Sequence, residues 1–515
     1  MLLLFTIHIL MTEKNNLKEI GGLIEALRER SGLTQSELAD KLDTSQSAVA
    51  RMEKGEQNFT TEILSKVSEA LHHNILTLSK GTMNFQIEGG RKLSGEVNTK
   101  TSKNAAVALL CASLLNRSTT ILKNMPRIEE VSRIIEVISS IGVDVRWVEN
   151  DIHITPPKVL NMSALNTESA VKTRSIIMLI APLIHLMKEF NLPQVGGCKL
   201  GSRSVRPHFY ALQEMGIKIE TKSDHYHIST KKLKPGYVVM YESGDTVTEN
   251  VLMAAALIPG KTVVKFASAN YMVQDMCFFL ESLGVKIEGI GTTTLTIHGI
   301  ETIDMPVTYY PSEDPTESMF FLAAAATTNS SIQINRCPID FLELELLKMS
   351  KMGFKYKILR EYLANNGKTR LVDIKTFPST LKALEEKIES RPYPGLNIDN
   401  LPFFAVIATQ AKGQTLIHDW VYEKRAIYYT ELEKLGAETI LADQHRIFIN
   451  GPTPLKAAQV VCPPALRPAT IILIGMLAAK GTSMLRNVYS INRGYEDLAN
   501  RLNLLGAKIK TFQEF

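Results

Sequence analysis

The chain has 515 residues, of which 45% are hydrophobic and 22% charged, and its formal net charge is +5. This length exceeds one ordinary hydrophobic core, so we expect two or three domains. The charge excess is too small to indicate a polyanion as the main partner. The five cysteines, Cys111, Cys198, Cys277, Cys337 and Cys462, have no metal-ligand spacing. Their pattern argues against a zinc site or a disulfide framework and favours a reducing, cytoplasmic compartment.

Residues 1–16 form an N-terminal extension. Its apolar run, residues 1–10, is too short to span a membrane and lacks a basic flank and a small-residue cleavage site. We therefore expect neither a signal peptide nor a membrane span, and we expect translation to start at Met11.

Residues 17–81 are predicted to form a small all-helical domain, because apolar residues recur at helical spacing in four short blocks. Ala39 stands where two helices must cross closely, and Leu38, Val49 and Met52 are expected to face inward. The segment resembles the helix-turn-helix of the Cro and phage-repressor family.

The helix-turn-helix resemblance implies contact with DNA. It would place Gln46, Ser47 and Arg51 on the exposed face of the recognition helix, with Gln35 at a phosphate. Acidic residues slightly outnumber basic ones in this segment, which weakens the electrostatic attraction to DNA. An interaction module with the same fold is the alternative.

From Met83 onward a sequence pattern recurs at roughly 70-residue spacing. It consists of the end of a helix, a glycine, and then the alternating apolar and polar residues of a strand. The glycines are expected to end each helix in the left-handed conformation. They are Gly142, Gly216, Gly284, Gly353, Gly436 and Gly506.

A strongly apolar helix, introduced by a polar loop, is expected before each of these glycines. Helices that are apolar nearly all round are buried. Their expected ranges are 104–115, 175–186, 250–257, 318–326, 401–409 and 468–479.

Six βα-rich units predict an α/β protein with two pseudo-threefold domains, and a solenoid is the less favoured alternative. Buried helices that begin at the same cleft make it electropositive, because their N-termini carry partial positive charge. The pattern therefore predicts an anionic substrate. The residues expected at this cleft are Lys103, Asn104, Arg174, Cys198, Arg203, Asp399, Arg425, Arg467 and Arg493.

Cys198 is the cysteine that we single out for chemistry. It lies in the glycine-rich stretch 196–203, between Lys199 and Arg203, and nearby cations favour the thiolate. Cys111 and Cys277 stand in apolar helical runs and are expected to be core residues.

Four segments resemble the UDP-N-acetylglucosamine 1-carboxyvinyltransferases, which share a fold with the shikimate-pathway enolpyruvyl transferase. They are residues 102–106 after 93–97, residues 172–174, the loop 196–203, and residues 493–496. The resemblance covers residues 83–515. It implies a two-lobed enolpyruvyl transferase fold, an inside-out α/β barrel of six repeats.

The implied lobes are residues 83–102 with 312–515, and residues 103–311 with the Cys198 loop. The implied reaction adds the sugar 3-hydroxyl of UDP-N-acetylglucosamine to C2 of phosphoenolpyruvate and then releases phosphate, the first committed step of peptidoglycan precursor synthesis. No cofactor or metal is expected.

The resemblance also implies roles for single residues. Cys198 would be the general acid towards C3 of phosphoenolpyruvate or would assist product release, and Asp399 would be the base at the hydroxyl or its orienting partner. Lys103, Arg203 and Arg493 would neutralise the phosphate and carboxylate, with Arg425 and Arg467 nearby.

Asn104 and Arg174 would contact the sugar and diphosphate, and the backbone of residues 203–207 would contact the uracil. The complete implied set of substrate-binding residues is Lys103, Asn104, Arg174, Arg203, Ser204, Val205, Arg206, Pro207, Asp399, Val421, Arg425, Arg467 and Arg493.

Four positions depart from the family pattern: Arg206, Glu242, Asp245 and Ala465. Carboxylates at 242 and 245 are unfavourable where a diphosphate is expected. Two alternatives therefore stay open. One is a related enolpyruvyl transferase with another nucleotide acceptor, and the other is a helix-turn-helix regulator that uses the transferase-like body as a ligand sensor.

Overall fold

The computed structural model describes residues 17–18, 20–22, 24–29, 31–56, 61–71, 82–194 and 204–514. The predicted N-terminal extension, Cys198 and Arg203 lie outside these residues. The chain divides into two compact units, residues 1–82 with 513–515, and Met83–Phe512. No helix among the described residues is long and apolar enough to cross a bilayer.

The N-terminal unit contains α2 (Gln35–Lys41), α3 (Gln46–Lys54) and α4 (Thr61–Ala70). Thr34 and Glu37 form a capping box on α2, and the Ser45 side chain caps α3. The predicted inward positions are confirmed, since Leu38, Ala39, Val49 and Met52 are buried.

The predicted exposed face of α3 is also confirmed, because Gln46, Ser47 and Arg51 are exposed. Gln46 Nε2 donates a hydrogen bond to Gln35 Oε1 at 2.9 Å, and Gln35 Nε2 donates to Glu53 Oε2 at 2.8 Å. The amides on α2 and α3 are thus held in one network. Contact of these residues with DNA stays a prediction.

The large unit is built from six sheets, one for each predicted repeat. The first three in chain order are β13-β3-β5-β4, β6-β8-β7 and β11-β12-β10-β9. Their strands are β3 (Thr120–Leu122), β4 (Asp144–Val148), β5 (Asp151–Thr155), β6 (Glu189–Pro193), β7 (Ile217–Thr221), β8 (His225–Thr230), β9 (Tyr237–Val239), β10 (Gly260–Lys265), β11 (Lys286–Glu288), β12 (Thr294–Gly299) and β13 (Val307–Tyr309).

The other three sheets have the orders β15-β16-β14-β2, β17-β18-β20-β19 and β21-β22-β1-β23. Their strands are β1 (Thr82–Gly89), β2 (Ser94–Asn98), β14 (Ser331–Pro338), β15 (Lys355–Leu363), β16 (Arg370–Phe377), β17 (Ile388–Glu389), β18 (Gly413–His418), β19 (Glu438–Leu441), β20 (Arg446–Gly451), β21 (Gln459–Val461), β22 (Gly481–Arg486) and β23 (Lys508–Glu514).

Most of these sheets repeat one hydrogen-bonding pattern. A strand pairs in parallel with an edge strand on one side and antiparallel with a hairpin strand on the other, as in β9-β10-β12 and β17-β18-β20. This recurrence is the structural counterpart of the sequence repeat.

Each repeat also carries a buried inner helix. These are α5 (Lys103–Ala112) followed by η1 (Ser113–Leu115), η3 (Arg174–Leu179) followed by α8 (Ile180–Leu183), α10 (Asp245–Ala256), α12 (Pro315–Thr327), α14 (Leu401–Ala408) and α15 (Leu466–Ala478). One continuous helix over 175–186 is a wrong prediction, because Pro182 lacks the N–H that regular α-helical bonding requires.

Outer helices follow the inner ones. They are α6 (Glu129–Ser140), α9 (Arg206–Gln213), α11 (Tyr271–Ser282), α13 (Glu343–Lys351), η5 (Ala426–Leu435) and α17 (Leu498–Leu504). Short helices complete the chain: η2 (Met162–Ala164), α7 (Thr167–Val171), η4 (Ile339–Phe341) and α16 (Tyr489–Asn492).

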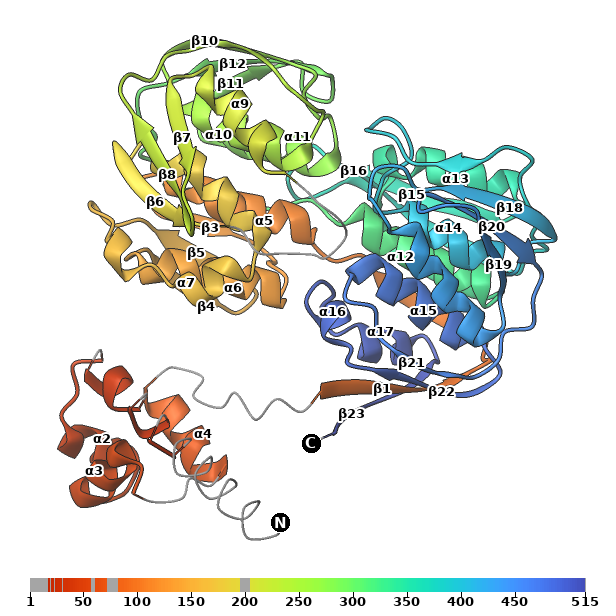
Figure 1. Ribbon diagram of the computed structural model, residues 1–515, viewed down its shortest axis with the longest axis horizontal. Helices are drawn as coiled ribbons and strands as arrows, with labels where there is room; N and C mark the ends of the chain where they lie inside the picture. Colours follow the sequence, from red (N-terminus) through yellow and green to blue (C-terminus); the bar gives the residue numbers. More distant parts are fainter. Residues whose placement is uncertain are drawn as a thin grey trace. The chain divides into compact units, whose positions relative to one another are not determined.

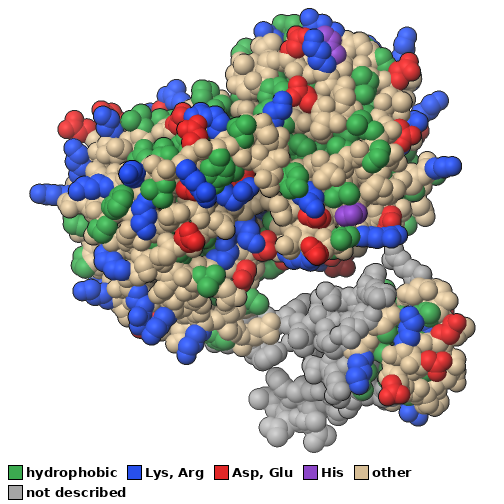
Figure 2. Space-filling view, turned by 180° about the vertical axis from the view of Figure 1, so that it is seen from behind, with side chains coloured by type: hydrophobic (Ala, Val, Ile, Leu, Met, Phe, Trp, Pro, Cys, Tyr) green, Lys and Arg blue, Asp and Glu red, His purple; other side chains and the backbone are tan. Residues whose placement is uncertain are grey.

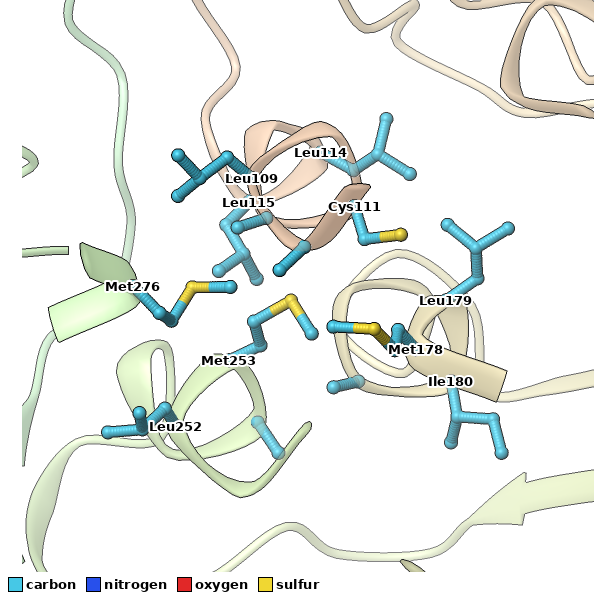
Figure 3. Packing of buried hydrophobic residues seen from close by; sticks show 14 of the residues in the cluster. Leu109, Cys111, Leu114, Leu115, Met178, Leu179, Ile180, Leu252, Met253 and Met276 are labelled. Atoms are coloured by element: carbon cyan, nitrogen blue, oxygen red, sulfur yellow. The ribbon is translucent and has the colours of Figure 1, made fainter. Parts of the chain in front are cut away.

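The inner helices form two hydrophobic cores. One comprises buried residues between Ala105 and Tyr309, and the other those between Phe85 and Val97 and between Met319 and Ile509. In the first, Met178 of η3 and Met276 of α11 point towards Met253 of α10 (Figure 3). In the second, α12, α14 and α15 lie side by side (Figure 1).

The repeat glycines adopt the predicted left-handed conformation, with φ of 103° at Gly142, 89° at Gly216, 90° at Gly284, 93° at Gly353, 85° at Gly436 and 91° at Gly506. Each follows an outer helix. The left-handed backbone is unfavourable for a residue with a Cβ atom, so these positions select glycine.

Gly216→Ala and Gly284→Ala separate backbone strain from steric overlap. Both substitutions place alanine at a φ near 90°, which costs about 1–2 kcal/mol. A Cβ at Gly216 would lie 2.4 Å from the Lys232 carbonyl oxygen, whereas a Cβ at Gly284 would have no neighbouring heavy atom within 4 Å. We expect thermal unfolding to show both variants destabilised, with Gly216→Ala clearly the worse. Equal losses would contradict this account.

Candidate functional site

A cavity of about 1000 Å³ opens in the large unit, and residues of both cores line it. Four inner helices begin at its wall, at Lys103 of α5, Arg174 of η3, Asp245 of α10 and Leu466 of α15. Asp399, just before α14, also lines the cavity, whereas the first residues of α12 do not. The predicted convergence of helix N-termini therefore holds for five of the six repeats, and it favours an anionic ligand.

The cavity brings together most of the predicted site residues that the structure describes. Those in its wall are Lys103, Asn104, Arg174, Ser204, Arg206, Pro207, Asp399, Val421, Arg425, Arg467 and Arg493. Val205, the N-cap of α9, does not belong to the wall. Cys198 and Arg203 lie outside the described residues, so their predicted roles rest on the sequence.

Lys103 is held at the start of α5 by an ion pair. Its Nζ lies 3.0 Å from Glu130 Oε2, and Ser102 caps the helix beneath it. Burial raises the pKa of the Glu130 carboxyl, but Lys103 and Arg493 outweigh this effect and lower it overall. Arg493 Nε is buried and has no hydrogen-bond partner among the described residues. Lys103 and Arg493 thus both bring positive charge to the Glu130 carboxylate in the cavity wall.

Asp399 lies between two arginines. Arg467 Nη2 is 3.1 Å from its Oδ2, and Arg425 Nη1 is 3.9 Å from its Oδ1. Burial raises the pKa of the Asp399 carboxyl, but Arg467, Arg425 and Lys103 lower it below the ordinary value. Asp399 is therefore ionised at neutral pH and is suited to accept a hydrogen bond from a hydroxyl group.

Arg425 is itself almost completely buried. It forms a bidentate pair with Asp419, at 2.5 Å from Nε and 2.9 Å from Nη2, and Nη2 also donates to the Ile398 carbonyl at 2.8 Å. Tyr429 donates its hydroxyl to the same carboxylate at 2.5 Å. Arg425 therefore has few donors left for a ligand, and its guanidinium positions Asp399 from behind.

Arg467 stands in the first turn of α15 and is also largely buried. Its Nη1 donates to the Tyr495 hydroxyl at 2.8 Å, in addition to the contact with Asp399. Two structural partners therefore orient it, and its guanidinium faces the cavity.

The predicted nucleotide side of the cavity is formed by η3, α9 and the start of α10. Arg174 Nη2 donates to the Ser204 carbonyl at 3.1 Å, and the Ser204 hydroxyl accepts from the Arg206 backbone at 3.1 Å. Asn104 Nδ2 donates to the Tyr271 hydroxyl at 3.2 Å. These bonds connect loops that are distant in sequence into one wall.

Three of the four residues that depart from the family pattern belong to this wall, namely Arg206, Glu242 and Asp245. Asp245 accepts hydrogen bonds from Ser268 Oγ at 2.6 Å and from Asn270 Nδ2 at 3.3 Å. Ala465 caps α15 and is buried outside the wall. Carboxylates thus border the side of the cavity where the resemblance implies a diphosphate.

The sequence interpretation missed three carboxylates that shape the site: Glu130, Asp419 and Glu249. Only Glu249 adjoins a predicted apolar segment, 250–257, where a charged residue needs a partner or a function. That position was the one available signal. Glu130 and Asp419 lie outside the predicted apolar segments, so the pattern gave no signal for them.

The other cysteines of the structure belong to the cores. Cys111, Cys277, Cys337 and Cys462 are free and buried. Burial raises the pKa of the Cys337 and Cys462 thiols to about 12, and it raises those of Cys111 and Cys277 further. The core positions predicted for Cys111 and Cys277 are confirmed. Within the described ranges, no cluster of three His, Cys, Asp or Glu residues is arranged to hold a metal ion.

Solved structures share this architecture. The enolpyruvyl transferase NikO from Streptomyces tendae superposes with a TM-score of 0.71 at 23% identity, covering 84% of this chain and all of that one. An EPSP synthase from Acinetobacter baumannii superposes with a TM-score of 0.65 at 18% identity, over 84% of this chain and 100% of the other. At these identities the likeness concerns the fold.

Other relatives, found by sequence, have a higher identity to this chain than these two structures. The chain is 33% identical over 437 residues to a UDP-N-acetylglucosamine 1-carboxyvinyltransferase of Bradyrhizobium diazoefficiens, covering 84% of this chain and 98% of the relative. It is 32% identical over 428 residues to the protein of the same name from Borrelia garinii subsp. bavariensis, over 83% of this chain and 98% of that one.

Two family models also match. The helix-turn-helix model matches residues 24–72. The model of EPSP synthase (3-phosphoshikimate 1-carboxyvinyltransferase) matches residues 87–502, which include every described residue of the cavity wall. Behind its N-terminal helix-turn-helix unit, the chain therefore belongs to the EPSP synthase family of enolpyruvyl transferases.

Proposed function

We propose that the protein transfers the enolpyruvyl group of phosphoenolpyruvate to the 3-hydroxyl of UDP-N-acetylglucosamine and releases phosphate. The carrying observation is the cavity wall, where Arg467, Arg425 and Lys103 keep Asp399 ionised and Arg493 lines the same cavity. The names of the relatives at 32–33% identity support the choice of acceptor.

The proposed reaction has two halves. Asp399 accepts or orients the proton of the acceptor hydroxyl while its oxygen forms a bond to C2 of phosphoenolpyruvate, and Cys198 delivers a proton to C3. The resulting tetrahedral ketal then loses a proton from C3 as the bond from C2 to the phosphate oxygen breaks. Lys103 and Arg493 stabilise the phosphate throughout, since preorganised cations act most strongly in a site that excludes water.

A second acceptor is favoured by one observation, the carboxylates of Glu242 and Asp245 in the predicted nucleotide wall. Phosphate release with a panel of nucleotide sugars distinguishes the two. Turnover with another acceptor and none with UDP-N-acetylglucosamine would reject the first choice. No phosphate release with any acceptor would favour the ligand-sensing regulator.

Lys103→Ala tests the catalytic cavity. Loss of one preorganised cation is expected to lower kcat/KM for phosphoenolpyruvate by about 10²–10³-fold. The control is Lys218→Ala, which removes an exposed lysine of β7 that pairs with Glu220. Coupled detection of phosphate gives both values, and equal activity of the two variants would exclude Lys103 from the reaction.

Cys198 is expected to be the first thiol to react with a fosfomycin-like epoxide or iodoacetamide at neutral pH. The four buried cysteines are protected by burial and by their raised thiol pKa values. Peptide mass spectrometry should find the label on Cys198, and labelling should disappear in Cys198→Ser. Faster labelling of any buried cysteine would contradict the prediction.

We also propose that the helix-turn-helix unit binds DNA through Gln35, Gln46, Ser47 and Arg51. The match to the helix-turn-helix model and the exposed face of α3 support this. The face in Figure 2 shows acidic side chains beside basic ones on this unit, so we expect modest affinity with strong dependence on salt.

Arg51→Ala is expected to weaken binding to a mixed-sequence 30-bp duplex about tenfold and to reduce the salt slope by about 1. Lys41→Ala removes the same charge from the end of α2 and serves as the control. Fluorescence anisotropy at several salt concentrations measures both, and indistinguishable variants would remove Arg51 from the interface.

A further inference from the structure

Two segments that are far apart in the chain meet at the cavity wall. Residues 127–130 lead into α6, whose Val131 belongs to the first core. Residues 489–496 begin with α16, whose Ile491 belongs to the second core. Contacts between these segments therefore connect the two halves of the large unit.

Two hydrogen bonds connect the segments. The Tyr489 hydroxyl donates to Glu129 Oε1 at 2.8 Å, and the Arg127 backbone N–H donates to Glu496 Oε2 at 3.2 Å. Burial and the bond to Glu129 raise the pKa of the Tyr489 hydroxyl, so it stays protonated and can donate at neutral pH. Arg133 Nη2 also donates to Glu129 Oε1, at 2.8 Å, from the next turn of α6. The bond from Tyr489 is thus charge-assisted, and its acceptor is held in place.

The same two segments carry charged groups of the site. Glu130 follows Glu129 directly and accepts a hydrogen bond from Lys103 Nζ at 3.0 Å. Arg493 caps the C-terminal end of α16, and its backbone N–H donates to the Tyr489 carbonyl at 2.9 Å. Lys103 and Arg493 both lower the pKa of the Glu130 carboxyl. Two cations from different cores therefore act on one carboxylate.

The spacing of these two cations has to be imposed by the fold, because like charges repel each other. Glu130 offsets part of the repulsion between Lys103 and Arg493. The bond between Glu129 and Tyr489 ties the turn that carries Glu130 to the turn that ends at Arg493. Loss of this bond would release Arg493 from the half of the molecule that holds Lys103.

We propose that Glu129 and Tyr489 are positioning residues, whose hydrogen bond between the two cores sets the distance between Lys103 and Arg493 for the phosphate of phosphoenolpyruvate. They act through Arg493 and need no contact with the phosphate. This inference rests on the proposed enolpyruvyl transfer and adds two residues to its phosphate-binding machinery.

The test is a double-mutant cycle on the full-length chain with Tyr489→Phe, Arg493→Ala and the combined variant. Tyr489→Phe removes the hydroxyl and keeps the ring. Calorimetry measures binding of phosphoenolpyruvate, and phosphate release with UDP-N-acetylglucosamine measures turnover. We expect Tyr489→Phe to weaken phosphoenolpyruvate binding about five- to tenfold in the otherwise unmodified chain. In Arg493→Ala the same change should cost less than about twofold, because the side chain that it positions is gone.

A second cycle pairs Tyr489→Phe with Glu129→Ala, which removes the acceptor. Each change alone should weaken binding, and the combined variant should be no worse than the weaker of the two, since both remove one bond. Should Arg493→Ala bind too weakly to measure, this second cycle decides, and additive losses in it would overturn the positioning role.

The control is Tyr237→Phe, the same change at an exposed tyrosine of β9 outside the cavity wall, which should leave binding unchanged. Weaker binding that depends on Arg493 supports the positioning role even if no phosphate is released, in which case only the proposed transfer fails. Unchanged binding in Tyr489→Phe, or the same loss with and without Arg493, would overturn the positioning role, and phosphate release would still support the transfer. A chain that binds no phosphoenolpyruvate would overturn both.

Discussion

The architecture of the site depends on keeping several cations charged in a cavity walled by apolar helices. An unpaired buried charge is strongly unfavourable, and breaking a buried pair costs about 3–5 kcal/mol. The chain meets this constraint by pairing three of these cations with carboxylates. Asp419 holds Arg425, Asp399 meets Arg467, and Glu130 meets Lys103.

These pairs also decide which cations can act on a ligand. Arg425 is occupied by Asp419 and the Ile398 carbonyl, so its main effect is to hold Asp399 in place. Arg493, in contrast, lines the cavity, and its buried Nε has no hydrogen-bond partner among the described residues. The two arginines thus differ in how far the protein itself uses their donors.

The six repeats explain how such pairs can form across the chain. Each repeat delivers the start of one inner helix, and five of the six starts lie at the cavity. A residue in one repeat therefore meets partners from another repeat, as Arg467 meets Asp399, which lies 68 positions earlier in the chain. Glu249 differs, because its buried Oε1 has no hydrogen-bond partner among the described residues.

The sequence by itself determined the local structure: buried helices from their apolar composition, left-handed glycines after the outer helices, and the cores of both units. Local rules suffice there, because capping, helical period and burial depend on neighbouring residues. They failed at 175–186, where Pro182 breaks regular bonding. Much of the cavity wall, including Lys103, Asp399 and Arg467, also followed from the sequence through the family resemblance.

Only the tertiary structure decided how charges pair. No local pattern joins Lys103 to Glu130 on the next helix, or connects Arg425 through Asp419 to the orientation of Asp399. Glu249 showed the same limit, since its lack of a partner is defined by everything that packs around it. The physical reason is that electrostatic energies depend on distance and burial in space, and the linear order of residues contains neither.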